Sequence, residues 1–280
     1  MKESGITDAE FARFQRLIHE IAGISLADSK KVLLVGRLGK RLRALQLGSF
    51  GQYHDLVANP DNVQERQTMV DLLTTNETYF FREQAHFDYL RSTIVPEHPR
   101  KQPLNIWSAA ASTGEEIYTL AMVLADCLGV EGNWNIMGSD ISTQVLAVAR
   151  RGQYWVERTR GLPVEYRHTY CLKGVRSQEG SFLIAPELRR HTRFMQINLN
   201  DTLPDIGLFH VVFLRNVMIY FDNDTKREVV GRIVRKLHPG GYLIVGHSES
   251  LNGITEAVKL VRPTIYRLPP APATTGSSRP

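Results

Sequence analysis

A stretch of mixed polar and aromatic residues at positions 74–82, TTNETYFFR, carries groups that could bind a ligand. Thr74 and Glu77 have the spacing of a capping box, which predicts that a helix begins here. This cap leaves an amide, a hydroxyl and a guanidinium beside three consecutive aromatic rings, a mixture better suited to a ligand than to a plain helix start. The hydrogen-bonding candidates are Asn76, Thr78 and Arg82.

A second set of polar residues follows the apolar segments that we predict as parallel strands. In such a sheet, ligands bind beyond the carboxyl ends of the strands. Asp140 ends WNIMGSD and can either accept hydrogen bonds from ribose hydroxyls or cap the next helix. Arg215 and Asn216 end FHVVFLRN, where an unsatisfied polar pair would be unfavourable to bury. Asn198, in INLND, can pair with an adenine edge or cap a loop.

The loop after the first predicted strand, SAAASTGEE, has small residues that allow a ligand to approach the backbone. It contains one glycine where the dinucleotide fingerprint G-x-G-x-x-G has three, so we do not predict dinucleotide binding. Glu116 lies in the first turn of the following helix. There its carboxylate can accept from a cationic amino group, or it can simply be a favourable charge near the helix N-terminus.

The elements that position these residues fall into two parts. Residues 1–73 are predicted to be helical: Thr7 and Glu10 form a capping box, and apolar residues recur at three- and four-residue steps. In SKKVLLVGRLGKRLRALQL the basic residues are expected outside and the apolar ones inside, namely Val32, Leu33, Leu34, Leu38, Leu42 and Leu45. Residues 74–102 are expected to form a linker and a helix that covers a ligand.

From about residue 103 strands and helices alternate, which predicts an α/β fold with a mostly parallel sheet over residues 103–268. Its first helix should be capped by Ser112 or Thr113 and end at Gly129. A Gly-rich turn between short apolar runs predicts an antiparallel hairpin insert at about 155–190. The tail, residues 269–280, is Pro/Ser/Thr-rich and is expected to be disordered.

Composition sets further limits on the chain. Its 280 residues carry a net charge of +5 and two cysteines without partners at metal spacing, so neither a disulfide framework nor a zinc site is indicated. No membrane span or signal peptide is apparent, which predicts a cytoplasmic protein. Basic residues concentrate at 30–43 and at 150–193, where ten Lys/Arg face four Asp/Glu. These segments are either solvated faces or a surface for an acidic protein, nucleic acid or anionic lipid.

Several motifs together resemble one enzyme family. LHPGGYLIVG is similar to the L-x-P-G-G-x-L step before the fifth strand of class I methyltransferases. In chain order, TTNETYFFR, IWSAAASTGEEIYTLAM, SDIS and RNVMIYF followed by GHSE resemble the chemotaxis receptor methyltransferases, the CheR family, from about residue 5 to 268. The resemblance implies a class I S-adenosylmethionine-dependent methyltransferase fold, Rossmann-like, with a small N-terminal helical domain and an antiparallel hairpin insert.

The resemblance also implies an activity: methyl transfer from S-adenosylmethionine, with S-adenosylhomocysteine as product, to glutamate side chains of chemoreceptor cytoplasmic domains, forming methyl esters. No metal is implied. Arg82 and Tyr220 are the candidates for orienting the carboxylate, and Arg82 could instead hold the methionine carboxylate. Phe80 and Phe81 are expected to pack the seam between the domains or to shield the sulfonium. The implied cofactor contacts are Asn76, Thr78, Arg82, Glu116, Asp140, Asn198, Leu199, Arg215 and Asn216.

The partners implied are chemoreceptors. The basic helix Lys30–Arg43 would face their acidic methylation region, and the insert resembles the element by which some members dock a receptor's C-terminal pentapeptide, although its turn, LKGVRSQEG, lacks G-x-G. Two other functions remain to be weighed. One is a non-catalytic adaptor with the same fold. The other is nucleic-acid methylation. The sequence argues against it, because RNVMIYF occupies the position where an N/D-P-P-Y/F motif would be expected.

Overall fold

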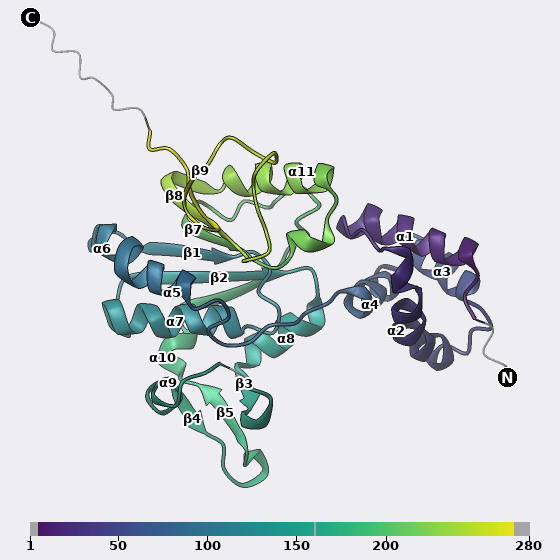
Figure 1. Cartoon of the computed structure of the whole chain (residues 1–280). Coiled ribbons are helices and arrows are strands. Elements are labelled where there is room, and N and C mark those ends of the chain that lie inside the picture. The colour runs from purple at the N-terminus through teal and green to yellow at the C-terminus, as the bar shows by residue number, and fades with distance from the viewer. Residues whose placement is uncertain (1–4, 160, 272–280) are drawn as a thin grey trace, which may run out of the picture.

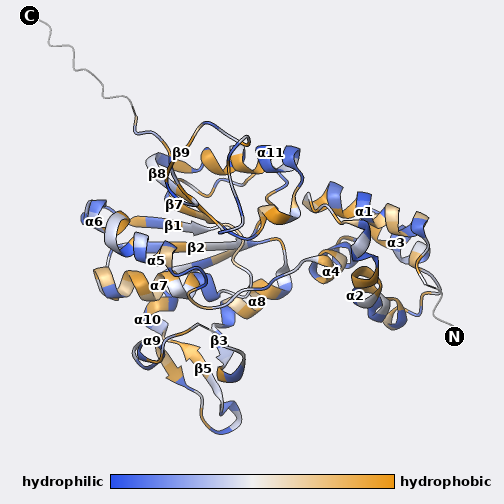
Figure 2. Cartoon of the chain, viewed as in Figure 1, coloured by the Kyte–Doolittle hydropathy of each residue, from blue (hydrophilic) through white to orange (hydrophobic). Residues whose placement is uncertain are grey.

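The computed structural model describes residues 5–159 and 161–271, and Figure 1 shows an N-terminal group of helices beside a larger sheet domain. The N-terminal helices are α1 (Asp8–Ala22), α2 (Lys31–Ala44), α3 (Phe50–Ala58) and α4 (Val63–Leu73). Both colours of the hydropathy scale appear on each of them in Figure 2, as expected for amphipathic helices packed around a shared core. That core contains fully buried Phe14, Ile18, Leu34 and Leu38.

Two local predictions for this domain have different outcomes. The capping box at the start of α1 is confirmed, because Thr7 accepts from the Glu10 N–H and the Glu10 side chain accepts from the Thr7 N–H. The prediction that Val32 lies inside is wrong, since this side chain is 83% exposed. Leu34 and Leu38, one helical turn apart, occupy the buried face of α2, and Val32 lies on the opposite side.

The larger domain is built on a seven-stranded sheet. The strand order is β6-β2-β1-β7-β8-β10-β9, parallel from β6 to β8 and antiparallel at β10 and β9, which confirms the mostly parallel α/β fold. The bounds are β1 (Leu104–Ser108), β2 (Trp134–Asp140), β6 (Thr192–Gln196), β7 (Phe209–Leu214), β8 (Leu237–Val245), β9 (Lys259–Arg262) and β10 (Ile265–Arg267).

Helices cover both faces of this sheet. On one face α7 (Glu115–Leu128) and α5 (Ala85–Tyr89) pack against Ile106, Val211 and Phe213. α5 continues through a π-helical turn, Leu90–Ile94, into α6 (Val95–Glu97). On the other face α11 (Asn223–Val234) packs against Val212 and Leu214, as expected from the alternation of side chains along a strand. α8 (Thr143–Arg151) packs beside β2 and β6.

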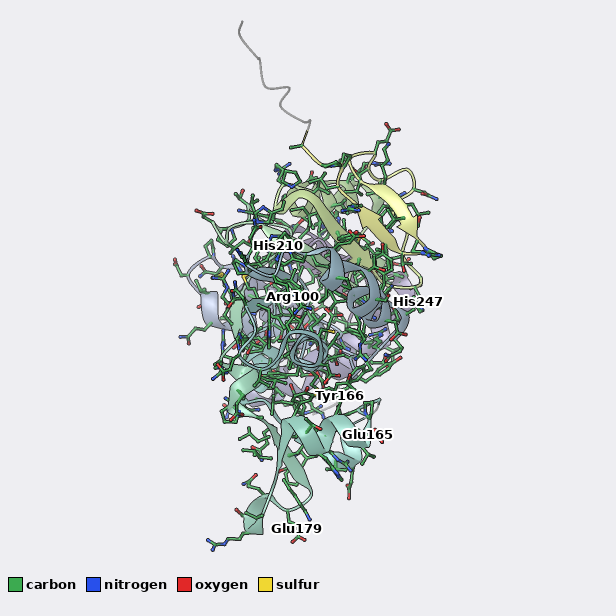
Figure 3. All side chains as sticks on the ribbon, turned by 90° about the vertical axis from the view of Figure 1, so that its left-hand side faces the viewer. Arg100, Glu165, Tyr166, Glu179, His210 and His247 are labelled. Atoms are coloured by element: carbon green, nitrogen blue, oxygen red, sulfur yellow. The ribbon has the colours of Figure 1, made fainter. Side chains whose placement is uncertain are left out.

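An insert between α8 and β6 forms a second sheet, which lies below the main sheet in Figure 1. The predicted antiparallel hairpin is present as β4 (Cys171–Lys173) and β5 (Ser181–Ile184), and a third strand, β3 (Gln153–Trp155), pairs with the other edge of β5. The sticks of Figure 3 place Glu179 at the far tip of the insert. Short helices α9 (Val164–Tyr170) and α10 (Pro186–Arg189) flank it, and 3-10 turns occur at Asp28–Lys30, Val156–Arg158, Arg176–Gln178 and Met218–Tyr220.

Several predicted boundaries are wrong. No helix begins at Thr74: this residue ends α4, its hydroxyl donates to the Asp71 carbonyl, and the chain stays irregular until Ala85. The helix α7 has Gly114 as its N-cap, with φ +98°, rather than Ser112 or Thr113. Its predicted end at Gly129 is confirmed.

The segment that resembles L-x-P-G-G-x-L, residues 237–243, lies inside β8 rather than before it, where the pairing with β7 shifts register. Of the predicted tail, residues 272–280 lie outside the described residues. Within the described ranges, no helix is both long and apolar enough to cross a membrane.

Candidate active site

A cavity of about 520 Å³ lies at the carboxyl ends of the parallel strands, where the N-terminal helices meet the sheet domain. Its volume falls within the range of about 300–1,000 Å³ that is typical of small-molecule sites. The structure brings all ten residues predicted for the site into its lining. These are Asn76, Thr78, Arg82, Glu116, Asp140, Asn198, Leu199, Arg215, Asn216 and Tyr220.

Arg215 is the charged centre of the cavity wall. Its side chain is 2% exposed and lies between two carboxylates, with Nη1 2.7 Å from Glu116 Oε2 and Nη2 3.0 Å from Glu83 Oε2. Nη2 also donates to the Arg82 carbonyl. Burial opposes ionisation of Glu83, but Arg215 and the Asn216 amide outweigh it and the pKa of Glu83 is lowered. Arg215 therefore holds the 82–83 segment against the end of β7.

Glu116 keeps its carboxylate oriented toward the cavity through two contacts. The Ser108 hydroxyl, at the end of β1, donates to Oε1 at 2.7 Å, and Arg215 donates to Oε2 at 2.7 Å. The first turn of α7 places it there, because Gly114 starts the helix directly after the loop from β1. Each carboxylate oxygen retains a lone pair that could accept from a cationic ligand.

Asp140, at the end of β2, is buried and holds two loops together. Its Oδ2 accepts from the Ser112 N–H at 2.9 Å and its Oδ1 from the Ser142 N–H at 2.9 Å. Burial raises the pKa of Asp140, and the backbone donors oppose this shift. The alternative that Asp140 caps the next helix is wrong, because Ser142 is the N-cap of α8 and accepts from the Val145 N–H. The other lone pairs of the Asp140 carboxylate remain available as hydrogen-bond acceptors.

The crossing segment 74–84 forms one wall of the cavity. The Ser112 hydroxyl donates to the Asn76 carbonyl at 2.8 Å and so fixes the segment to the loop after β1. The Arg82 guanidinium donates to the Glu77 carbonyl at 2.7 Å and lies 5.7 Å from the centre of the Tyr79 ring. Phe81 and Glu83 have positive φ, +56° and +60°, a conformation that residues other than glycine rarely adopt.

The two phenylalanines of this segment do not line the cavity, and both predicted roles for them are wrong. Phe80 is 1% exposed and contacts Tyr154 and Phe182 of the insert, with ring centres 5.1 and 6.1 Å away. Phe81 packs on Phe87 and Tyr166. Polar residues of the segment thus line the cavity, and the adjacent Phe80 and Phe81 anchor it to the sheet domain and the insert.

The N-terminal domain closes the other side. Arg37 of α2 donates to the carbonyls of Leu73 and Thr74, at 2.8 and 2.9 Å. The Ser25 N–H donates to the Tyr220 carbonyl at 2.8 Å. The Asn198 amide donates to the Ile21 carbonyl at 2.7 Å, so this cavity-lining residue also contacts the N-terminal domain.

Four residues of the site were not among the predictions. The sequence predicts Ser112 only as a helix cap and Arg37 only as part of the basic helix. Glu83 follows the motif TTNETYFFR directly, but its pairing with Arg215 spans 132 residues and leaves no local signal. Glu249, of the motif GHSE, accepts from the N–H groups of Asn216, Met218 and Gly246, at 2.8, 2.8 and 2.7 Å, and shapes the loop after β7.

The site has groups suited to a cofactor that is both nucleoside and amino acid. Acidic Asp140 and Glu116 face the cavity beside cationic Arg82 and Arg215, and among the described residues the buried Nε–H of Arg215 finds no acceptor. A mostly parallel sheet with helices on both faces and this cavity at its carboxyl edge defines a cofactor-binding α/β domain of the class I methyltransferase type.

Comparison with known proteins gives the family. The model of the CheR methyltransferase, SAM binding domain, matches residues 76–267, and that of the CheR methyltransferase, all-alpha domain, matches residues 9–74. The chain belongs to the CheR methyltransferase family. The chemotaxis protein methyltransferase of Escherichia coli is 41% identical over 269 residues, covering 94% of this chain and 92% of that protein. That of Salmonella typhimurium is 40% identical over 267 residues, covering 94% and 91%.

Solved structures of other methyltransferases are also similar, at lower levels. The N-methyltransferase NodS from Bradyrhizobium japonicum in complex with S-adenosyl-L-homocysteine matches 78% of this chain and 97% of its own, with 14% identity and a TM-score of 0.41. The family assignment makes this protein an S-adenosylmethionine-dependent chemotaxis methyltransferase.

Proposed function

We propose that this protein transfers a methyl group from S-adenosylmethionine to glutamate side chains of chemoreceptor cytoplasmic domains, forming methyl esters in the cytoplasm. The observation that supports this most strongly is the convergence of segments 76–82, 112–116, 140 and 215–220 on one cavity. These are the segments that carry the family resemblance. Acidic and basic side chains line the cavity, and the proposed reaction needs no nucleophilic serine or cysteine from this chain.

The cofactor would be held at both its ends by residues of this cavity. Asp140 would accept from ribose hydroxyls, the Asn198–Leu199 backbone would lie near the adenine, and Glu116 would accept from the amino group of the methionine part. Asn76, Thr78, Arg215 and Asn216 complete the proposed contacts. When bound, S-adenosylmethionine supplies a methyl group activated by the sulfonium charge.

The residues of this chain have little proton chemistry to perform. A glutamate carboxylate, with an ordinary pKa of about 4.3, is already an anionic nucleophile at neutral pH. One of its oxygens forms the new bond to the methyl carbon as the bond from carbon to sulfur breaks, and the electron pair stays on sulfur. Opposite charges are neutralised in this step, so a cavity that excludes water favours it, and correct placement can contribute on the order of 7–11 kcal/mol.

Arg82 and Tyr220 are our candidates for placing the carboxylate. Both line the cavity: Arg82 comes from the crossing segment and Tyr220 from the turn after β7. The Arg82 guanidinium donates through Nη1 to the Glu77 carbonyl, which leaves other N–H groups to hold a carboxylate. The same fork could hold the methionine carboxylate, and these two roles predict different kinetics.

A substitution of Arg82 separates the two roles. If Arg82 orients the glutamate, Arg82→Met should lower kcat for methyl transfer by about 10²-fold while the affinity for S-adenosylmethionine stays unchanged. If it holds the methionine carboxylate, the same variant should weaken cofactor binding in calorimetry, and kcat should change less. A variant that changes neither would remove Arg82 from the site.

The receptor would approach from the side of the N-terminal domain. Lys30 lines the cavity mouth and Lys40 is exposed on α2, so these remain available to an acidic partner. Other basic residues of the helix have partners within the chain: Lys31 contacts Asp8, Arg37 the carbonyls described above and Arg41 the Glu65 carboxylate. A receptor C-terminal peptide at the insert remains part of the proposal, through pairing with its edge strands.

The direct test is methyl transfer from labelled S-adenosylmethionine to receptor fragments. A base-labile, volatile methyl product identifies a carboxyl ester, and its absence despite cofactor binding would favour the adaptor function. For the site, Asn76→Ala should weaken cofactor binding by about tenfold, the loss of one good hydrogen bond. The matched control is Asn133→Ala, which removes an exposed amide beside the amino end of β2. This variant should bind the cofactor as the wild type does.

A further inference from the structure

A cluster of one carboxylate and two imidazoles lies next to Arg215 but does not line the cavity. It contains Glu83, His86 at the start of α5 and His247 in the loop after β8. Their potential ligand atoms lie within 4.8 Å of one another. The cysteine pattern gave no indication of a metal site, because these three residues are not cysteines and lie up to 164 positions apart.

His86 points a nitrogen without a partner into this cluster. The side chain is 1% exposed, and its Nδ1 makes no hydrogen bond in the structure. The other nitrogen, Nε2, lies 2.7 Å from the Thr264 hydroxyl oxygen. That hydroxyl donates its own hydrogen to the Pro263 carbonyl, so it can only accept from His86.

This arrangement determines the tautomer of His86. The hydrogen resides on Nε2, and in the neutral ring Nδ1 then carries a lone pair. The Nδ1 lone pair faces Glu83 Oε2 at 3.5 Å, an oxygen that already accepts from the His247 N–H at 3.1 Å and pairs with Arg215 Nη2 at 3.0 Å. A cation between Nδ1 and Glu83 would give the buried lone pair of His86 the partner that it lacks.

The geometry suits a small divalent ion. Ligands about 2.1 Å from a tetrahedral Zn²⁺ are about 3.4 Å apart, close to the observed separation of Nδ1 and the Glu83 oxygen. The His247 ring lies 5.1 Å from the His86 ring, centre to centre, and its side chain is exposed, so a rotation can bring a nitrogen into range. Figure 3 shows His247 at the side of the sheet domain that faces the viewer, open to solvent.

Charge and lone pairs also permit an ion. Glu83 and Glu116 place two carboxylates beside the single positive charge of Arg215, and imidazole nitrogens are common metal ligands. Glu83 Oε1 accepts from the Asn216 amide at 3.1 Å, which leaves it a second lone pair. The hydrogen bond from His86 to Thr264 is the kind of outer contact that orients an imidazole ligand in metal sites.

We propose that Glu83, His86 and His247 form a binding site for a divalent transition metal of the zinc type, with three protein ligands and a position open to solvent. Such an ion would tie the start of α5 to the loop after β8, on the far side of the residues that form the cavity wall. The site is distinct from the proposed methyl transfer, which needs no metal.

The test uses the full chain, freed of metal with a chelator and titrated with ZnCl₂ by calorimetry and with CoCl₂ by visible absorption. We expect one ion per chain and a Co²⁺ spectrum of low-coordinate nitrogen and oxygen ligation, without the near-ultraviolet band of cysteine sulfur. His247→Ala should weaken Zn²⁺ binding at least roughly tenfold, as should Thr264→Val through the orientation of His86.

The control variant is His238→Ala. It alters a separate pair of stacked rings, those of His210 and His238, whose centres lie 4.4 Å apart, and it should bind Zn²⁺ like the wild type. His247 is exposed and its removal leaves the core unchanged, so loss of binding there cannot be attributed to misfolding. Stoichiometric binding that survives in His247→Ala, or no binding by the wild type at micromolar Zn²⁺, would overturn the proposal.

Discussion

Replacing Glu116 by glutamine is expected to destabilise the sheet domain because it removes one of two counter-charges from a buried guanidinium. The Arg215 side chain is 2% exposed, and Glu116 and Glu83 lie 2.7 and 3.0 Å from it. Removing one partner of a buried ion pair costs about 3–5 kcal/mol. Because Glu83 remains and glutamine still accepts a hydrogen bond, we expect Glu116→Gln to lower the free energy of unfolding by about 2–3 kcal/mol.

Urea unfolding at pH 7, followed by tryptophan fluorescence, measures this change. Trp107 and Trp134 are buried in the sheet domain and report on its transition. The matched control is Glu228→Gln: Glu228 also contacts an arginine, Arg232, at 2.6 Å, but it is 65% exposed. A surface pair of this kind contributes about 0.3–0.5 kcal/mol.

The N–O distances of the two ion pairs are similar, 2.7 and 2.6 Å, so the comparison isolates burial as the cause of any difference in stability. If the two variants lost equal stability, the reasoning from burial would be refuted. Arg215→Met provides a second check. It leaves two carboxylates without a cation, so it should destabilise the domain by at least as much as Glu116→Gln, about 3–5 kcal/mol.

Three further changes test other parts of the structure. Asp71→Ala removes hydrogen bonds from the Thr143 N–H and hydroxyl, and it should speed proteolysis of the 74–84 segment and lower stability by about 2 kcal/mol. Phe80→Ala should cost about 3–5 kcal/mol in urea unfolding yet leave cofactor affinity nearly unchanged in the folded protein. Burial and the neighbouring histidines lower the pKa of His210 to about 4, so the unfolded chain takes up a proton there between pH 6.5 and 4 and stability is lost as pH falls through that window. His210→Gln should flatten this pH dependence by about 0.5 kcal/mol per pH unit after allowance for solvent screening, and an unchanged slope would contradict it.

The class of fold and the segments that meet at the site could be predicted from the sequence, because their signals are local. The run WNIMGSD coincides with β2, and the spacing of Thr7 and Glu10 marks the start of α1. Strands β3 and β9 went unpredicted, since three or four residues carry too little periodicity. β9 has all four residues exposed, so it lacks even the alternation of a half-buried strand.

Local signals failed where a distant partner competes for the same group. TTNETYFFR has the spacing of a helix cap, but the Thr74 hydroxyl donates to Asp71, and the segment is held extended by Ser112 and Arg37. Thr113 could cap α7 by sequence, yet its hydroxyl donates to the Glu115 side chain and Gly114 begins the helix. A capping pattern shows which hydrogen bonds nearby residues can form. Contacts with distant residues decide which of these bonds form in the folded chain.

The sequence by itself determined which residues are polar at the ends of buried strands, and therefore which side chains converge on the cavity, because parallel strands place their carboxyl ends on one edge. Only the tertiary structure decided how those side chains are used. Arg215 finds Glu83 across 132 positions, and His86 meets His247 across 161. Such contacts form when the sheet brings distant segments together, and the short-range periodicity of the sequence cannot predict them.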